Sequence, residues 1–100
     1  MADSQAMARI AAAIDANFDK QVQFLAELVR FPSLRGLEAP LQDWFARQMA
    51  ARGYAVDRYT LADVPPHPKM APMVECDPAG SVQVVATHRA KNPIGRSLIL

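Results

Sequence analysis

The stretch MARIAAAIDANFDKQVQFLAELVRFP, residues 7–32, determines how the first third of this 100-residue chain folds. Its large apolar side chains recur every three or four residues, which places them along one side of a helix. This stripe consists of Met7, Ile10, Ile14, Phe18, Val22, Leu25 and Val29. Asp3 or Ser4 can cap the start of the helix, and Pro32 ends it because proline lacks an N–H and restricts the preceding residue. We therefore predict one continuous amphipathic helix.

The polar face of this helix indicates that the stripe packs into a protein core. A helix that lies on a membrane surface has a basic polar face. Here acidic and basic residues are mixed on it: Arg9, Asp15, Asp19, Lys20, Glu27 and Arg30. The stripe widens toward the C-terminal end of the helix, where we expect the deepest burial, at Phe24, Leu28 and Phe31.

A second helix is predicted over residues 39–52. Pro40 suits its first turn, where the missing N–H is not needed. Gly53 is the expected left-handed terminator. The apolar positions of this helix are Leu41, Trp44, Phe45 and Met49.

The remaining residues predict strands joined by one long connection. Alternating side chains over residues 54–61 predict a short strand that can expose one face to solvent. Residues 81–87 predict the next strand. Residues 62–80 hold five of the eight prolines, so we expect a connection that is not helical. Residues 97–100 begin an apolar third strand, of the kind that is buried on both faces. The fold class is therefore α/β, with two helices and then three strands, and the pattern is that of an incomplete sheet.

Composition excludes several classes of protein. Eleven Lys and Arg residues against ten Asp and Glu give a formal charge of +1, too even for a dedicated nucleic-acid binder. No apolar run approaches the roughly 20 residues of a membrane span. A single cysteine excludes an intramolecular disulfide framework and a multi-cysteine zinc site. No secretory signal is present at the N-terminus, so with the free Cys76 we expect a cytoplasmic protein.

No catalytic, cofactor-binding or metal-ligating residue is assigned from the pattern of residues. His67 and His88 have no second ligand at a metal-binding spacing. The carboxylates of the C-terminal half are scattered, and acidic neighbours disfavour a reactive Cys76 thiolate. Arg35, with Gly36 and Glu38, is a candidate anion clamp, although a solvated turn is the default interpretation. The scattered carboxylates are Asp57, Asp63, Glu75 and Asp77.

The order of short motifs resembles a known family from Gln21 onward. Phe31-Pro32-Ser33-Leu34-Arg35-Gly36-Leu37-Glu38, after a long helix, resembles the turn near the start of the zinc-dependent amidohydrolases and peptidases that include acetylornithine deacetylase and succinyl-diaminopimelate desuccinylase. Arg52-Gly53-Tyr54 with Val56-Asp57, then His67-Pro68 and residues 82–87, are similar to its next segments. Residues 95–100 resemble the strand that leads into this family's Gly-His-x-Asp motif.

The resemblance implies that residues 1–100 are the N-terminal portion of a three-layer α/β/α zinc-hydrolase catalytic domain. An intact member would bind two zinc ions, hydrolyse the amide bond of an N-acyl amino acid or a peptide, and form a homodimer through a smaller dimerisation or lid domain, which is absent here. The family's ligands match no residue of this chain, including His67 and His88. We therefore expect the chain alone to bind no zinc and to be inactive, with no nucleic-acid or membrane partner.

Two alternatives from other functional classes stay open at this point. The first is a small non-catalytic α+β interaction module that folds on its own. The second is an adaptor whose Pro65-Pro66-His67-Pro68 segment serves as a polyproline ligand, although basic residues are sparse around it.

Overall fold

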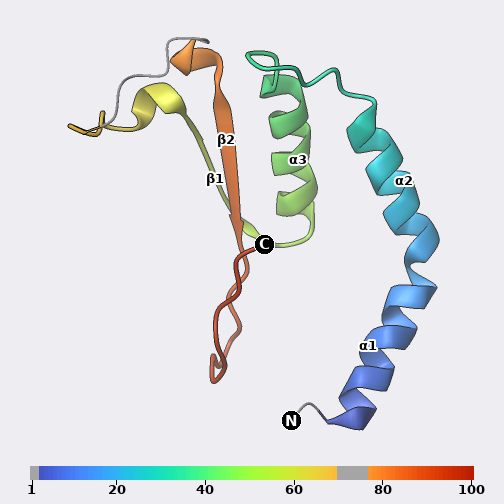
Figure 1. Cartoon of the computed structure of the whole chain (residues 1–100). Helices are drawn as coiled ribbons and strands as arrows, with labels where there is room; N and C mark the ends of the chain where they lie inside the picture. The colour runs from blue at the N-terminus through green and yellow to red at the C-terminus, as the bar shows by residue number, and fades with distance from the viewer. Residues whose placement is uncertain (1–2, 70–76) are drawn as a thin grey trace. The chain divides into compact units, whose positions relative to one another are not determined.

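The computed structural model describes residues 3–69 and 77–100 (Figure 1). The chain divides into two compact units, Met1–Pro32 and Ser33–Leu100. The first unit is helical, and the second combines one helix with an antiparallel β-hairpin. The fold class is therefore mixed α/β, with three helices and a two-stranded sheet among the described residues.

The first unit contains two helices in place of the single one predicted, α1 (Ser4–Ala16) and α2 (Phe18–Val29). The break lies at Asn17, whose backbone has φ −105° and ψ 6°. Its side-chain Nδ2 donates to the carbonyl oxygen of Ala13 at 2.8 Å, and its backbone N donates to the same oxygen at 3.2 Å. An asparagine side chain competes in this way with the regular backbone ladder. The prediction of a continuous helix was wrong at this one residue.

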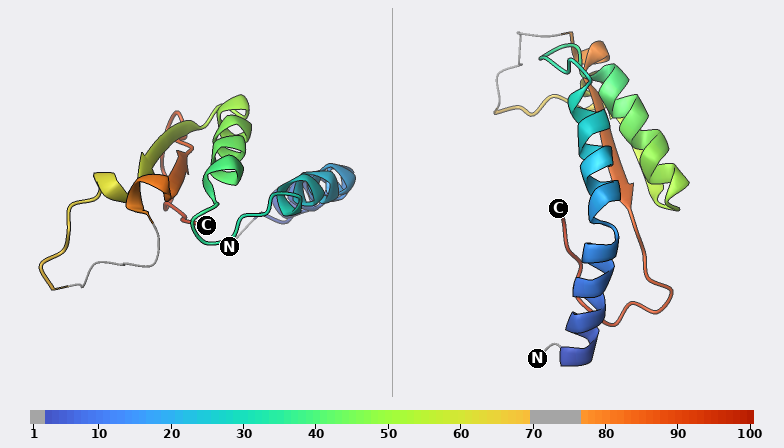
Figure 2. Two further views of the ribbon diagram at one scale, coloured as in Figure 1. Left: turned by 90° about the horizontal axis from the view of Figure 1, so that it is seen from above. Right: turned by 90° about the vertical axis from the view of Figure 1, so that its right-hand side faces the viewer.

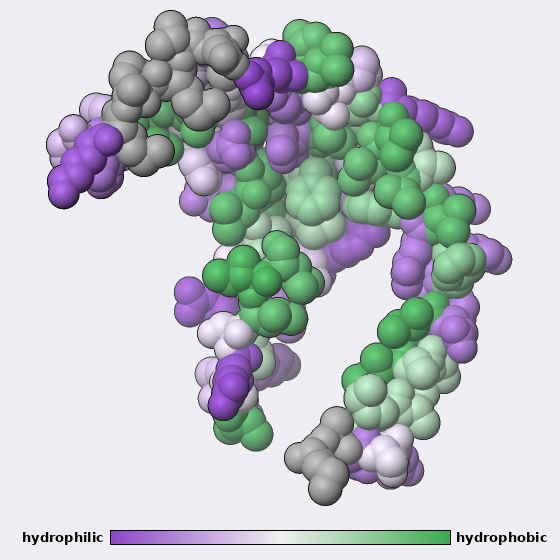
Figure 3. Space-filling model, in the orientation of Figure 1, coloured by the Kyte–Doolittle hydropathy of each residue, from purple (hydrophilic) through white to green (hydrophobic). Residues whose placement is uncertain are grey.

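The apolar stripe continues through the break, and its seven members are 50–69% exposed. Figure 3 shows these apolar side chains gathered along one side of the two helices. Phe24, Leu28 and Phe31, where the deepest burial was expected, are half-buried, whereas Val29 at the same end is 69% exposed. The start of α1 is capped by Asp3, whose carboxylate accepts a hydrogen bond from the Gln5 N–H at 3.0 Å. Within the described residues the stripe is thus ordered as a helix face without being enclosed in a core.

The second unit begins with the turn that leads into α3 (Ala39–Ala51). Gly36 lies in this turn with a φ of 84°, a conformation that glycine adopts without strain. Pro40 occupies the first turn of α3, as predicted. At the other end Gly53 has a φ of 85°, and the Tyr54 N–H donates to the Met49 carbonyl oxygen at 3.1 Å. The predicted second helix and its glycine terminator are confirmed.

The hairpin pairs β1 (Ala55–Thr60) with β2 (Val82–Thr87) in antiparallel register, from Ala55 opposite Thr87 to Thr60 opposite Val82. Alternate residues point to opposite faces of a sheet. One face carries Arg58, which is bonded to Asp43 of α3, so this face lies against the helix (Figure 2). The same face carries Val82, which is 3% exposed. Other residues of the face toward α3 are Val56, Thr60, Val84 and Ala86.

The opposite face of the hairpin is largely exposed. Asp57 of β1 lies opposite Val85 of β2 on it, and Val85 is 48% exposed. Tyr59 and Gln83, also on this face, are half-buried. Both strands were predicted within one residue of their bounds, and the exposed face of the first one agrees with its alternating sequence.

Short 3-10 turns stand at both ends of the long connection, η1 (Leu61–Asp63) and η2 (Pro78–Gly80). The Leu61 N–H donates to the Ser81 carbonyl oxygen at 3.1 Å, which closes the connection at its base. The expectation that residues 62–80 contain no helical residue was therefore wrong at the edges. Proline is tolerated at the first position of a helical turn, and Pro78 occupies that position.

The predicted third strand at residues 97–100 is wrong for the described chain. These residues form no strand, and Leu98, Ile99 and Leu100 are 79%, 95% and 110% exposed. A strand forms only where a neighbouring strand supplies its hydrogen-bond partners. The sheet of the described residues has two strands, and neither pairs with residues 97–100. Separately, none of the helices found in residues 3–69 and 77–100 has the length and apolar character needed to cross a membrane.

We expect Gly53→Ala to destabilise the chain by about 1–2 kcal/mol, because a Cβ is strained in the left-handed region. A Cβ at position 53 would meet nothing within 4 Å, so the cost is conformational. Urea unfolding followed by the fluorescence of Trp44 on α3 measures the effect. Gly95→Ala is the control, since Gly95 has open space around it and no positive φ. Equal effects of the two substitutions would contradict this assignment of the turn.

Candidate functional site

Two carboxylates of the second unit, Asp63 and Asp77, accept hydrogen bonds from nearby backbone and side-chain groups. Asp63 accepts hydrogen bonds from the Thr60 N–H at 2.8 Å and from the Thr60 hydroxyl at 3.0 Å. These bonds favour the ionised form and hold the pKa of Asp63 below its ordinary value. Asp77 accepts from the Ala79 N–H at 3.1 Å. Both side chains therefore cap 3-10 turns, η1 and η2.

The ion pair between Asp43 and Arg58 joins α3 to β1. Arg58 Nε lies 2.6 Å from Asp43 Oδ1, and a second guanidinium nitrogen lies 3.4 Å from Oδ2. The hydrogen bond from Arg58 lowers the pKa of Asp43 and outweighs the opposing effect of partial burial. The same pair raises the pKa of Arg58 above its ordinary value. Sequence analysis did not find this pair, because 15 residues separate its members and no local motif marks them.

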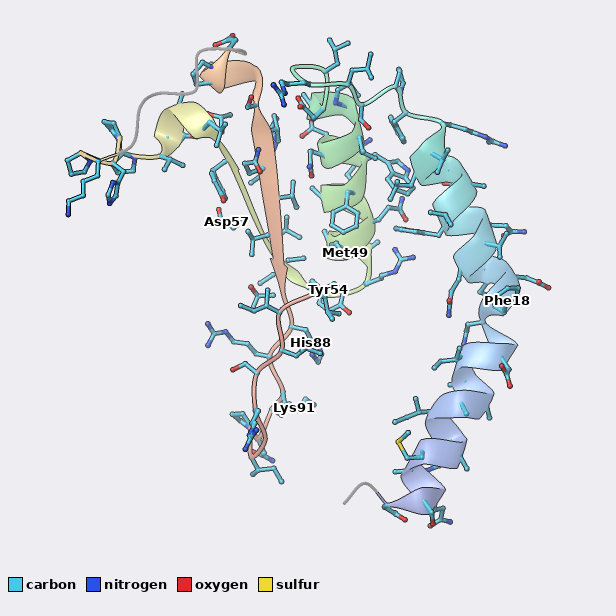
Figure 4. The ribbon with its side chains drawn as sticks, in the orientation of Figure 1. Phe18, Met49, Tyr54, Asp57, His88 and Lys91 are labelled. Atoms are coloured by element: carbon cyan, nitrogen blue, oxygen red, sulfur yellow. The ribbon has the colours of Figure 1, made fainter. Side chains whose placement is uncertain are left out.

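The two histidines lie in different local environments. His88 follows β2 and Tyr54 precedes β1, so the hairpin register brings them together at its open end. Their rings meet edge to face, with centroids 5.6 Å apart and planes at 89° (Figure 4). His67 Nδ1 accepts a hydrogen bond from the Lys69 N–H at 3.1 Å within the proline-rich segment. The ring contact explains the place of His88 without assigning it chemistry.

The candidate anion clamp, Arg35 with Gly36 and Glu38, forms a turn before α3 in which one carboxylate oxygen of Glu38 is shielded from solvent. Arg35 is exposed, and Gly36 gives the turn its left-handed residue. Glu38 stands at the N-cap of α3, where its backbone carbonyl oxygen accepts from the Gln42 N–H at 2.9 Å. Its side-chain Oε2 is shielded from solvent without a hydrogen-bond partner among the described residues.

Within residues 3–69 and 77–100, no three side chains of His, Cys, Asp or Glu lie close enough together to hold an ion. Two of the residues considered in the sequence, Glu75 and Cys76, lie outside the described residues. The described donor set therefore does not fit the pair of zinc ions that the family resemblance implies.

Comparison with known proteins does not assign a function to these residues. The chain matches no protein-family model, and no curated protein matches it. Among the residues described above, Asp43 and Arg58 join α3 to β1, and Asp63 and Asp77 cap the two 3-10 turns. These contacts neutralise the charges of Asp43 and Arg58 and give backbone N–H groups hydrogen-bond acceptors.

We expect Asp43→Asn to lower the free energy of unfolding at pH 7 by less than about 1 kcal/mol, because the pair is exposed to solvent. Its side chains are 47% and 38% exposed. The pKa of Asp43 is lower in the folded chain, so the contribution is full above the ordinary value of 3.8 and is lost as the pH falls through the folded pKa.

Urea unfolding at pH 7 and at about pH 3 tests this pH dependence. The difference between the original chain and Asp43→Asn should shrink at the lower pH. Asp57→Asn is the matched control, since it makes the same chemical change on the exposed face of β1. A difference that grows on acidification would contradict a stabilising role for the Asp43 carboxylate.

Proposed function

We propose that residues 1–100 are the N-terminal part of the catalytic domain of a metal-dependent amide hydrolase, similar to the acetylornithine deacetylase and succinyl-diaminopimelate desuccinylase family. The intact protein would hydrolyse an N-acyl amino acid or a peptide in the cytoplasm. In the proposed three-layer domain, this part supplies helices and strands, while the residues that hold the metal ions lie elsewhere in the protein.

The observation that carries the proposal is the order of elements around the turn at residues 33–38. The helices α1 and α2, this turn, α3 and β1 follow one another along the chain, and this order supports the proposal. The turn contains a left-handed Gly36, and α3 ends at a left-handed Gly53 before β1. A similar order of motifs is the basis of the resemblance, and the local structure gives each glycine a physical reason to stand where it does.

The hairpin supports a scaffolding role in this proposal. Open α/β sheets bind their ligands at the carboxyl ends of strands. The first strands of such a domain therefore help to position the loops that come later in the chain. The residues that join α3 to the hairpin, Asp43 and Arg58, are engaged with each other. The described residues provide no ligand set for zinc, and no catalytic step is assigned to them.

The first test is to sequence the source DNA through the codons that follow Leu100. The proposal expects the reading frame to continue into Gly-His-x-Asp within about five codons. A stop codon directly after Leu100 would contradict the hydrolase assignment, because the ligand-bearing part would not exist in this product. Function would then have to be sought in binding.

Activity of the 100-residue chain gives an independent test. We expect no hydrolysis of N-acetyl amino acids by the purified chain, with or without added Zn²⁺, because the described residues hold no metal cluster. Release of the free amino acid is measured with an amine-reactive reagent. Hydrolysis that a chelator abolishes would show that the chain carries its own metal site and would overturn the scaffolding role.

Hydrogen exchange separates this proposal from the self-contained interaction module. A module that folds independently would protect the amides of residues 97–100. The exposed Leu98, Ile99 and Leu100, which form no strand in the structure, should instead exchange within the dead time of the experiment. The amides of β1 and β2 that pair with each other provide the internal reference for protection.

A further inference from the structure

The apolar stripe along α1 and α2 leaves a large apolar surface uncovered in the part of the chain that the structure describes (Figure 3). Side chains of this size that are 50–69% exposed leave roughly 100 Å² of apolar surface each, or roughly 700 Å² over the whole stripe. The largest apolar patch on a typical monomeric protein covers about 300–600 Å². The stripe therefore exceeds the apolar surface that a monomer usually leaves open to water.

We propose that a second copy of this chain covers the stripe, with the α1–α2 segments of the two copies side by side, parallel and in register. Such a pair would bury up to roughly 700 Å² on each copy, close to the about 800 Å² per partner of a stable interface. The interface is closed at two copies, because both use the same face. This proposal uses the first unit alone and does not depend on the proposed hydrolase function.

The residue types of the stripe in α2 fit a pair of identical helices. Val22, Leu25 and Val29 follow one another at spacings of three and four residues, so a leucine alternates with β-branched residues. In parallel coiled coils, β-branched residues at the first core position of each heptad and leucine at the second favour two strands over larger assemblies. This pattern favours a copy of the same helix as the partner.

The break between α1 and α2 is compatible with a parallel, in-register pair. The stripe steps by four residues from Ile14 to Phe18, where a regular heptad pattern has a step of three. The extra residue falls at the break, at Asn17. In a parallel pair in register, both copies make this shift at the same height along the helices. Ile14 and Phe18 therefore each face the same residue of the second copy, and the two stripes stay opposite each other through the break.

The charges beside the stripe favour the parallel orientation over the antiparallel one. With about 3.6 residues per turn, the exposed Asp15 and Asp19 lie along the same border of the stripe. A two-fold axis parallel to the helices sets this border against the opposite border of the second copy, where the uncharged Gln21 lies. An antiparallel pair centred near Asn17 would instead bring the aspartates of both copies together, and facing like charges repel.

Sedimentation equilibrium of the full chain over a range of concentrations tests the proposal by measuring the dimer dissociation constant. Val22→Lys places an ammonium group within the stripe, where the second copy would bury it. We expect the dissociation constant to rise about tenfold or more. Gln23→Lys is the matched control, because it adds the same charge to the next residue of α2, which is exposed and outside the stripe. It should change the dissociation constant by less than about twofold.

Disulfide cross-linking tests the orientation of the two copies. In a Cys76→Ser background, Met7→Cys should link two chains on oxidation, because a parallel pair in register brings position 7 of both copies together. Positions 7 and 25 of different copies would lie roughly 27 Å apart along the helices. In a mixture with Leu25→Cys chains, each variant should therefore link to its own kind.

Three results would each overturn the proposal. The first is a monomer at all concentrations up to about 1 mM, or an open series of larger assemblies. The second is a dissociation constant that Val22→Lys leaves unchanged. The third is preferential linking of Met7→Cys chains to Leu25→Cys chains, which would show an antiparallel pair. Circular dichroism verifies that each variant keeps its helices, and the fluorescence of Trp44 verifies the fold of the second unit.

Discussion

The packing of α3 against one face of the β1–β2 hairpin is the contact on which residues 33–100 depend. A two-stranded hairpin is marginal in water unless a helix or more strands cover one of its faces. α3 provides that cover, and Val82 beneath it is the one hydrophobic side chain in the described residues that is buried. Gly53 allows the chain to reverse from α3 into β1 within a few residues, because its positive φ ends the helix at once. The Asp43–Arg58 pair adds a polar contact between this helix and β1.

The elements that follow from local sequence could be predicted, and those that depend on distant partners could not. Periodicity and glycine termini located the helices, and alternation located β1 and β2. The break at Asn17 was missed because one side-chain amide decides it. The strand expected at residues 97–100 has an apolar sequence but no neighbouring strand to pair with. An apolar sequence shows that a segment favours burial. Whether the segment becomes a strand depends on a neighbouring strand with which it can form hydrogen bonds.

The candidate site illustrates the same division between local and distant contacts. Aspartates at 3-10 turns can be recognised as caps from local sequence, since Asp63 at the end of η1 and Asp77 before η2 bond to backbone only two or three residues away. The Asp43–Arg58 pair and the Tyr54–His88 ring contact arise from the helix–hairpin packing and the strand register. Spacing along the chain carries no sign of either contact.

Among the residues that the structure describes, the sheet has two strands, so each strand leaves one edge without a neighbouring strand. Further strands of a catalytic domain require backbone groups that are free to pair, and β1 offers them on the side away from β2. The charges of β1 do not block such an extension, because Arg58 is already neutralised by Asp43 on the face toward α3. β2 lacks charges and is the strand less protected against pairing between molecules. In the proposed catalytic domain, the edge of β1 would thus be the one along which further strands complete the sheet.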